Sequence, residues 1–415
     1  MRLLVVSQYF WPETFRVNDL VEGLVARGHD VTVLTGRPNY PEGRIYESYR
    51  RDPAAFATFA GAPVLRVPLR PRGKGSLRLV LNYLSFIFWG CLLGPWKLRG
   101  RHFDAIFFWE TSPITSALPA ILLRRLKRAP LAMWVLDLWP ETLAAVGVTR
   151  SQRILNAVGW LVGFIYRRCD LILAQSQAFF ANIEHWSGDA SRIRYFPGWA
   201  EPLFGADPGT VPRAPEMEPY AGGFTVLFAG NIGEAQDFPA ILDAFAGLRS
   251  RPDIRLVVLG DGRAAEQVRA EIVHRGLTDT VVMLGKHPLE RMPSFFRAAD
   301  ALLVSLKPEP IFALTIPGKL QAYLAVGIPL VGMLDGEGAR VIRESGAGRA
   351  CPAGDAAGLA RIVTELADMS PVEREAMGVR GRDYGRQEFD RERLIDRLVG
   401  WLEEAATENA RRRAR

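Results

Sequence analysis

The stretch Phe228-Ala-Gly-Asn-Ile-Gly-Glu-Ala-Gln-Asp237 indicates the fold class of this chain most directly. It ends an apolar run, 224–229, whose continuous aromatic and β-branched residues are typical of a strand buried in a parallel sheet. Gly230 and Gly233 break this run, and residues 241–248 then carry apolar side chains at helical spacing. Strand, glycine turn and helix present backbone N–H groups to a phosphate, although most doubly wound folds carry such turns without a ligand. The stretch therefore predicts an α/β protein with one candidate phosphate turn.

A second stretch, Thr315-Ile-Pro-Gly-Lys-Leu-Gln-Ala322, places a glycine and a lysine at another predicted helix start. Two such turns in one half of the chain suggest a diphosphate held from two sides. Gly260-Asp-Gly262 and Gly285-Lys-His287 follow strands predicted at 255–260 and 280–284, so they are expected at the same edge of the sheet.

Size and composition favour a two-domain globular protein. The chain has 415 residues, which exceeds one ordinary core, and its hydrophobic content of 48% leaves no disordered majority. The three cysteines and five histidines are scattered without metal-ligand spacing, which favours a reducing cytosolic setting and predicts no zinc site. The apolar start of the chain is too short for a secretion signal and is predicted to be the first strand.

Strands and helices alternate in both halves of the chain. The first half has predicted strands at 2–6, 31–34, 103–109, 131–136, 171–174 and 193–196, and the second at 224–229, 255–260, 280–284, 301–305 and 329–332. Residues 205–222 are rich in proline and glycine and are expected to be a linker between domains 1–204 and 223–385. Residues 386–415 are expected to form a C-terminal helix that could pack back on the first domain and ends in a basic tail.

Residues 66–101 are expected to contact an anionic membrane surface. Residues 53–103 contain no acidic residue and eight basic ones: Arg66, Arg70, Arg72, Lys74, Arg78, Lys97, Arg99 and Arg101. Residues 77–96 are mostly apolar, but a membrane span needs about 20 uninterrupted apolar residues, so spanning is not expected. An in-plane membrane helix is favoured over a core helix under a basic surface, because Phe86, Phe88, Trp89 and Trp96 together exceed what a solvated face tolerates.

Two loops of the first half follow predicted strands, at the edge where open α/β sheets bind ligands. Residues 7–15 bring aromatic side chains and Glu13 to this edge, and a ligand-binding loop and a loop packed on its neighbours are equally compatible with them. Asp137 follows the strand at 131–136, where it could serve a site or cap the next helix. The site is the favoured interpretation.

Five motifs resemble family 4 of the GT-B glycosyltransferases: Arg27-Gly-His-Asp-Val-Thr-Val-Leu34, Cys169-Asp-Leu-Ile-Leu-Ala-Gln-Ser176, Gly230-Asn-Ile-Gly233, Gly260-Asp-Gly262 and Tyr323-Leu-Ala-Val-Gly-Ile-Pro329. Three more are similar to its WbuB/WcaI-like branch, which builds cell-surface polysaccharide on lipid-linked acceptors: Tyr9-Phe-Trp-Pro-Glu13, Asp137-Leu-Trp-Pro-Glu141 and Ile316-Pro-Gly-Lys319. The resemblance covers about residues 1–400. It implies two doubly wound, Rossmann-like domains that face a cleft.

The resemblance also implies an activity. This is the retaining transfer of a sugar from a nucleotide-sugar, a UDP-sugar rather than a GDP-sugar, to a polyprenyl-diphosphate-linked or other lipid-linked acceptor. The acceptor domain would sit on the inner face of the cell membrane, with the protein otherwise cytoplasmic. No Asp-x-Asp motif follows a predicted strand, so neither a metal nor another cofactor is expected, and no nucleic-acid partner is expected.

Site residues follow from the same resemblance. Donor-binding residues would be Gly230, Asn231, Ile232, Gly233, Gln236, Gly260, Lys286, His287, Ile316, Pro317, Gly318 and Lys319. Acceptor-binding residues would be Tyr9, Trp11, Arg16, Asn39, Trp139 and Glu141. The catalytic candidates are Lys319, which would stabilise the leaving diphosphate, and Asp137 and Glu13, which would orient hydroxyl groups.

The chain departs from the family pattern at five positions, one of which is the residue before Gly198-Trp199, where an expected Asn is absent. Asn231 and Gln236 stand where many members have Arg and Lys, and Leu314 and Ala322 replace a pair of glutamates. Two other functions therefore stay open. One is a sugar-nucleotide 2-epimerase, which shares the GT-B architecture but needs no apolar, basic surface. The other is a non-catalytic membrane-bound partner of another transferase.

Overall fold

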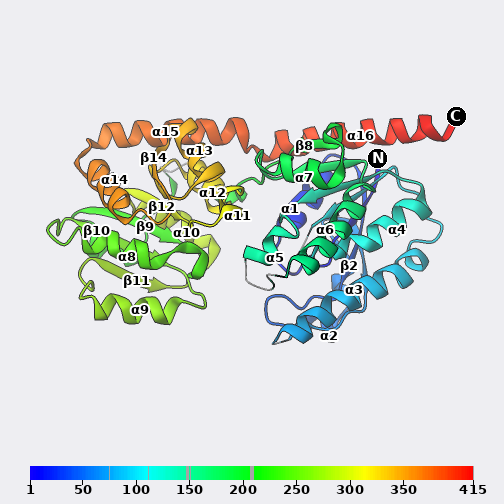
Figure 1. Cartoon of the computed structure of the whole chain (residues 1–415), viewed down its shortest axis with the longest axis horizontal. Coiled ribbons are helices and arrows are strands. Elements are labelled where there is room, and N and C mark those ends of the chain that lie inside the picture. The colour runs from blue at the N-terminus through cyan, green and yellow to red at the C-terminus, as the bar shows by residue number, and fades with distance from the viewer. Residues whose placement is uncertain (74, 111, 146–148, 150, 206–209, 415) are drawn as a thin grey trace. The chain divides into compact units, whose positions relative to one another are not determined.

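The computed structural model describes residues 1–415 except 74, 111, 146–148, 150, 206–209 and 415. Lys74, one of the predicted surface cations, thus lies outside the described residues. The chain forms two compact units, of which the first comprises Met1–Phe196 and Glu392–Arg415 and the second Pro197–Arg391 (Figure 1). Each unit is a sheet of mainly parallel strands with helices packed on it, so the predicted pair of doubly wound domains is confirmed.

The described strands of the first unit form an eight-stranded sheet in the order β3-β4-β2-β1-β5-β6-β7-β8. They are β1 (Arg2–Val6), β2 (Asp30–Gly36), β3 (Thr58–Phe59), β4 (Ala62–Val67), β5 (Ala105–Trp109), β6 (Leu131–Val135), β7 (Leu171–Ala174) and β8 (Ile193–Tyr195). The helices are α1 (Arg16–Ala26), α2 (Glu47–Arg51), α3 (Ser76–Lys97), α4 (Leu118–Lys127), α5 (Glu141–Ala145), α6 (Gln152–Tyr166), α7 (Phe179–Ser187) and α16 (Arg391–Ala414). All paired strands run parallel except β3 and β4.

The strands described in the second unit form a six-stranded parallel sheet in the order β11-β10-β9-β12-β13-β14. They are β9 (Phe224–Ala229), β10 (Ile254–Leu259), β11 (Val281–Gly285), β12 (Ala301–Ser305), β13 (Leu330–Met333) and β14 (Gly348–Cys351). The helices are α8 (Phe238–Ala246), α9 (Ala265–His274), α10 (Met292–Arg297), α11 (Pro310–Ala313), α12 (Gly318–Val326), α13 (Gly336–Ser345), α14 (Ala356–Asp368) and α15 (Pro371–Glu388). Phe228, Phe238 and Phe245 lie in the core between β9 and α8.

Both sheets have a topological switch point, where the chain reverses the direction in which it adds strands. In the first unit it lies between β1 and β5, and in the second between β9 and β12. Loops diverge at such a point and leave a crevice at the carboxyl ends of the strands. The loops after these four strands are therefore where each unit is expected to bind a ligand.

The linker prediction for 205–222 is wrong for the described part of that segment, because it packs on the second unit. Short 3₁₀ helices form at Pro202–Gly205 and Pro215–Tyr220. Within 205–222, Ala214 N–H donates to Ser294 O at 3.1 Å and Met217 is 3% exposed; Phe204, just before the segment, stacks on Phe296 with ring centroids 5.6 Å apart. The first unit ends at Phe196 rather than at 204, and residues 197–391 form the second unit.

The C-terminal helix α16 belongs to the first unit from Glu392 onward, whereas α15 belongs to the second (Figure 1). Arg27 at the end of α1 pairs with Asp396 at 2.6 Å and with Glu392 at 2.9 Å. Leu394, Ile395, Leu398 and Leu402 are buried. The second unit ends at Arg391, so the C-terminal segment that belongs to the first unit begins at residue 392 rather than at 386.

Helix α3 is the one described helix that is long and apolar enough to cross a membrane, judged by length and composition alone. One face packs on the first unit: Phe86 is fully buried, and a Cβ at Gly90 would lie 2.7 Å from a side-chain carbon of Pro119 in α4. The prediction that Phe86 faces a membrane is therefore wrong. The opposite face exposes more than half of each of Leu84, Phe88, Leu92 and Trp96.

Arg66 also leaves the predicted surface, because its guanidinium turns inward from β4. It donates to the carbonyl oxygens of Gly36 and Trp11, and burial lowers the pKa of Arg66 to about 10. It therefore ties together the loops after β1 and β2.

Candidate functional site

Glycine turns align along the carboxyl edge of the second sheet. Gly230 and Gly260 adopt φ of +139° and +135°, a region that side chains disfavour. A Cβ at Gly260 would lie 1.8 Å from the carbonyl oxygen of Gly230, so the turns after β9 and β10 touch through their backbones. Gly260 N–H donates to Gly285 O at 2.8 Å, which joins the turn after β11. The predicted donor-binding glycines 230 and 260 are thus brought together.

Lys319 lies in the first turn of α12, next to Gly230. A Cβ at Gly230 would lie 3.2 Å from Lys319 Nζ, and this amine stands 3.7 Å from the ring centroid of Phe228. The amine is buried and has no hydrogen-bond partner among the described residues. Burial lowers the pKa of Lys319 to about 7. A cation that is desolvated without a counter-charge at a glycine turn suits an anion that neutralises it.

Other predicted donor residues hold the turn in shape. Gln236 Oε1 accepts the N–H of Gly233 at 3.1 Å, and the Gln236 carbonyl oxygen accepts the Ser305 hydroxyl at 2.8 Å. Ile232 is fully buried, so only its backbone reaches the edge, and Ile316 is likewise buried. Asn231 and Gly318 are exposed, and Pro317 precedes the first residue of α12.

Lys286 and His287 follow β11 at the end of the sheet. Lys286 is exposed, whereas His287 packs on Phe295 with ring centroids 4.6 Å apart. His287 Nε2 also lies 3.2 Å from the carbonyl oxygen of Leu284. The role of the pair beside a nucleotide base stays a prediction.

Glu13 lies in the loop after β1, at the switch point of the first sheet. Its Oε1 accepts the N–H groups of Asn39 at 2.6 Å and Tyr40 at 2.7 Å, and Oε2 accepts that of Phe10 at 3.1 Å. Burial raises the pKa of Glu13 to about 7, although these three backbone bonds oppose the shift. Both oxygens are thus engaged in joining two loops. Glu13 positions its neighbours, a role that the prediction of a hydroxyl-orienting carboxylate did not include.

Asn82 of α3 organises the predicted acceptor residues Tyr9 and Asn39. Its Oδ1 accepts the Tyr9 hydroxyl at 3.0 Å and Gln8 Nε2 at 2.8 Å, and its Nδ2 donates to Arg70 O at 2.5 Å. Tyr9, Asn39 and Asn82 are all buried. Tyr9 and Asn39 therefore shape the loops at this edge, and their direct contact with an acceptor stays a prediction.

Trp11 and Arg16 flank this loop. The Trp11 ring lies 5.0 Å from that of Phe56 and 5.5 Å from that of Phe59, and Arg16 opens α1. Both side chains are partly exposed, and their contact with an acceptor stays a prediction.

Asp137 and Glu110 form a pair of carboxyl groups at the ends of β6 and β5. Asp137 accepts the Ser112 hydroxyl, and helix α5 begins four residues later, so Asp137 is not its N-cap. Glu110 Oε2 accepts the N–H of Leu136 at 2.8 Å and of Asp137 at 3.3 Å. Burial and then the nearby Asp137 raise the pKa of Glu110 well above its ordinary value. Sequence reasoning missed Glu110, although it follows a predicted strand just as Asp137 does.

Several buried polar atoms near these carboxyl groups have no hydrogen-bond partner among the described residues. They are Glu110 Oε1, Glu141 Oε2, Trp139 Nε1, Trp109 Nε1 and the Tyr166 hydroxyl. Glu110, Glu141 and Asp137 all act electrostatically on Tyr166, which places the four groups in one neighbourhood. Unpaired buried polar atoms are rare in folded proteins, and water or a polar ligand usually satisfies them. The predicted residues Asp137 and Glu141 therefore share one polar region with Glu110 and Tyr166, whereas the contact of Trp139 with an acceptor stays a prediction.

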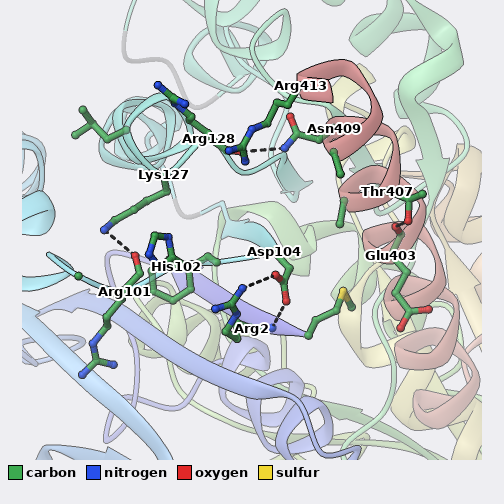
Figure 2. A pocket seen from close by; sticks show the side chains of 16 residues that line it. Arg2, Arg101, His102, Asp104, Lys127, Arg128, Glu403, Thr407, Asn409 and Arg413 are labelled. Carbon is green, nitrogen blue, oxygen red and sulfur yellow. Dashed lines mark hydrogen bonds and ion pairs between the residues drawn. The ribbon is translucent and has the colours of Figure 1, made fainter. Parts of the chain in front are cut away.

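A hollow of about 1010 Å³ lies at the opposite edge of the first sheet, where β1 and β5 begin (Figure 2). Arg2 pairs there with Asp104 at 3.2 Å, and Lys127 Nζ donates to the Arg101 carbonyl oxygen at 3.0 Å. The amino ends of parallel strands are not where open α/β sheets bind substrates. Within the described residues, no group of three or more His, Cys, Asp or Glu side chains could hold a metal ion.

Two family models match the chain in the order of its units. The model described as "Glycosyl transferase 4-like domain" matches residues 14–199, and the one described as "Glycosyl transferases group 1" matches residues 223–369.

Two curated proteins match most of the chain. The probable glycosyltransferase WbjE of Pseudomonas aeruginosa is 27% identical over 319 residues, which is 72% of this chain and 75% of that protein. The putative colanic acid biosynthesis glycosyl transferase WcaI of Escherichia coli (strain K12) is 23% identical over 350 residues, 79% of this chain and 82% of that protein.

Solved structures share the fold. HepE of Anabaena, in complex with UDP-glucose, superposes with a TM-score of 0.70 at 16% identity, covering 97% of this chain and 100% of that one. WaaG, a glycosyltransferase involved in lipopolysaccharide biosynthesis, superposes with a TM-score of 0.64 at 15% identity, covering 96% and 99%.

Proposed function

Because this chain belongs to the family 4 glycosyltransferases of the GT-B fold, we propose that it transfers a sugar from a nucleotide-sugar to a lipid-linked acceptor in cell-surface polysaccharide synthesis. The donor is a UDP-sugar rather than a GDP-sugar, and the acceptor sugar is carried on a polyprenyl diphosphate or another lipid. The names of WbjE and WcaI, and the UDP-glucose complex of HepE, support this direction.

The observation that carries the proposal is the buried amine of Lys319 beside Gly230, which has no hydrogen-bond partner among the described residues. A nucleotide-sugar supplies the counter-charge through its diphosphate. During transfer, the bond between the sugar carbon and the diphosphate oxygen breaks and negative charge grows on the leaving group. Lys319 and the N–H groups at the start of α12 would stabilise that charge.

On the acceptor side, the proposal gives Asp137 the role of orienting a sugar or acceptor hydroxyl. The new bond forms from the acceptor oxygen to the sugar carbon, and the leaving phosphate takes the hydroxyl proton, so Asp137 need not act as a base. Glu110 positions Asp137 through the two N–H groups that it accepts. No metal is required, because Lys319 supplies the positive charge.

Attachment to the inner face of the cell membrane completes the proposal. The exposed stripe of α3, defined as Leu84, Phe88, Leu92 and Trp96, supplies apolar surface. Lys97 and Arg99 stand at the carboxyl end of the helix. Near an anionic leaflet, each basic side chain contributes about 1 kcal/mol to the free energy of membrane binding.

Nucleotide-sugar turnover by the purified chain, with and without a polyprenyl-diphosphate-linked sugar, tests the proposal. Sugar transfer that requires the lipid acceptor is the expected result. Interconversion of two nucleotide-sugars without an acceptor would identify a 2-epimerase instead. Binding to the membrane with neither reaction would identify a non-catalytic partner.

A further inference from the structure

A hollow of about 410 Å³ lies beside the first turns of α3, and three arginines line it: Arg44, Arg70 and Arg78. Gly43 and Gly73 form part of its wall, and Leu81 of α3 supplies an apolar side chain. None of these residues belongs to the acceptor set predicted from the sequence.

Two glycine turns hold this hollow in shape. Gly73 N–H donates to Gly43 O at 2.9 Å, and a Cβ at Gly43 would lie 2.9 Å from Gly73 N. The stem of Arg78 covers Gly73, because its Cδ lies 2.7 Å from where a Cβ of Gly73 would stand. Arg70 is fixed through its backbone, whose N–H donates to Ser85 Oγ at 2.8 Å. The arginines are therefore carried by tied segments rather than by a free loop.

Only one of the three arginines that line this hollow has an ion-pair partner among the described residues. Among the described residues, neither Arg70 nor Arg78 forms an ion pair, and Arg44 has only the exposed Glu42 at 2.9 Å. Residues 53–103 contain no carboxylate that could do so. Guanidinium groups pair with phosphate oxygens through two parallel hydrogen bonds, so a phosphate-bearing ligand suits this cluster.

Apolar surface continues directly from the hollow along α3. Leu81 lines it, and the side chains of Leu77, Val80 and Leu84 are exposed nearby on the same helix. The segment that carries Arg70 also reaches the predicted acceptor loop, because Arg72 N–H donates to Asn39 Oδ1 at 2.9 Å. Cations, apolar helix and acceptor loop are thus contiguous within the first unit.

We propose that Arg44, Arg70 and Arg78 bind the diphosphate of the lipid-linked acceptor, with the first part of its hydrocarbon chain lying against Leu81 and Leu84. This site rests on the proposed function and specifies it: the acceptor would be recognised by a diphosphate joined to a hydrocarbon chain as well as by its sugar. An isolated anionic headgroup on a membrane shares the phosphate chemistry but not the diphosphate.

Calorimetric titration with geranyl diphosphate, a water-soluble prenyl diphosphate, tests the site without a membrane. Every protein carries Lys319→Ala, so that diphosphate binding in the second unit is weakened equally throughout. Arg70→Gln/Arg78→Gln should raise the Kd about tenfold or more, because each lost charged hydrogen bond weakens binding severalfold. The matched control is Arg128→Gln/Arg413→Gln, which removes the same charge from the hollow in Figure 2 and should change the Kd less than twofold.

Three outcomes would overturn the site. The two double variants could weaken binding equally, which would mean that only net charge matters. Inorganic pyrophosphate could bind as tightly as geranyl diphosphate, which would remove the hydrocarbon chain from the site. Geranyl diphosphate could fail to bind while phosphatidylglycerol vesicles do, which would leave a membrane-charge effect alone.

Two further measurements keep the result interpretable. Arg78→Gln alone, a change at an exposed position, replaces the double variant if circular dichroism shows that the latter unfolds. Nucleotide-sugar binding by the chain with Lys319 intact is measured separately. Its absence would refute the proposed function, whereas its presence with arginine-independent binding of geranyl diphosphate would refute this site alone.

Discussion

Lys319→Met removes the buried ammonium while keeping an unbranched side chain. We expect it to abolish the pH dependence of nucleotide-sugar binding that the buried amine causes. Burial lowers the pKa of Lys319 to about 7 in the free protein. A bound diphosphate brings opposite charge within reach and favours the ammonium form again. Above pH 7, binding therefore takes up a proton. The Kd of a nucleotide-sugar should stay level below pH 7 and rise about tenfold per pH unit above it, or about 30-fold from pH 6 to 8.5.

Calorimetry in buffers of different ionisation heat measures both this slope and the proton uptake. A nucleotide-sugar is used rather than a free nucleotide, because its diphosphate diester does not titrate in this range. Lys319→Met should bind more weakly at pH 6 and show a level profile. Arg269→Gln, which removes an exposed cation from α9, should keep the slope of the unaltered protein. A level profile for the unaltered protein, or an unchanged slope in Lys319→Met, would refute the assignment of the proton to Lys319.

The same burial affects stability in the opposite sense. Between pH 7 and 10.5, the unfolded chain holds a proton on Lys319 that the folded chain has released, so this residue makes the free energy of unfolding rise with pH in that window. Lys319→Met should therefore stabilise the ligand-free protein most at pH 6, by up to about 5 kcal/mol, and progressively less toward pH 10. Thermal unfolding at pH 6 and pH 9 checks this sign.

Three further predictions concern the remaining parts of the site and surface. Asp137→Asn and Glu110→Gln should each lower transfer while leaving nucleotide-sugar affinity within a few-fold, as parallel turnover and binding measurements would reveal; loss of donor affinity in either would contradict the assignment to the acceptor side. Transfer should survive EDTA, and activity lost in EDTA but restored by Mg²⁺ would indicate a missed metal site. Leu84→Ser/Phe88→Ser should release the protein from anionic vesicles while leaving its free energy of unfolding nearly unchanged. Phe86→Ser, at a buried position, should instead destabilise the protein by about 3–5 kcal/mol. If the double variant stays on the vesicles, the exposed stripe does not contact the membrane.

The parallel strands could be read from sequence because each central strand is buried on both faces. Largely apolar runs such as 3–6 and 224–229 are too short for a helix and too apolar for a loop, and the observed bounds of β1 and β9 agree with the prediction. Three strands were missed: β3 and β14, which lie at the edges of their sheets, and β4, which pairs with β3; all three are partly exposed. Pro63 and Arg66 interrupt β4, Gly348 and Arg349 interrupt β14, and β3 has only two residues, so none of the three carries a continuous apolar signal.

The partners of individual side chains could not be read in the same way. Phe86 and Phe88 are two residues apart on an apolar helix, and only the packing of α3 on the rest of the first unit decides that the first is core and the second exposed. In the sequence, Glu13 cannot be distinguished from a carboxylate that binds substrate. Its role depends on the backbone of Asn39 and Tyr40, which fold back to it from a loop 26 residues later.

Lys319 and Glu110 share a property that helical periodicity and strand pattern do not encode. Each is an ionisable group buried beside the switch point of its own sheet, and each keeps a polar atom without a partner among the described residues. Burial favours the neutral form of both groups. It therefore lowers the pKa of Lys319 and raises the pKa of Glu110. A group retained for stability alone would be paired inside the protein or replaced by an apolar side chain, since an unpaired buried polar atom costs about 1–3 kcal/mol. Both groups lie at a sheet edge where a ligand could supply the missing hydrogen-bond partner. This pattern is expected of a binding site rather than of a core.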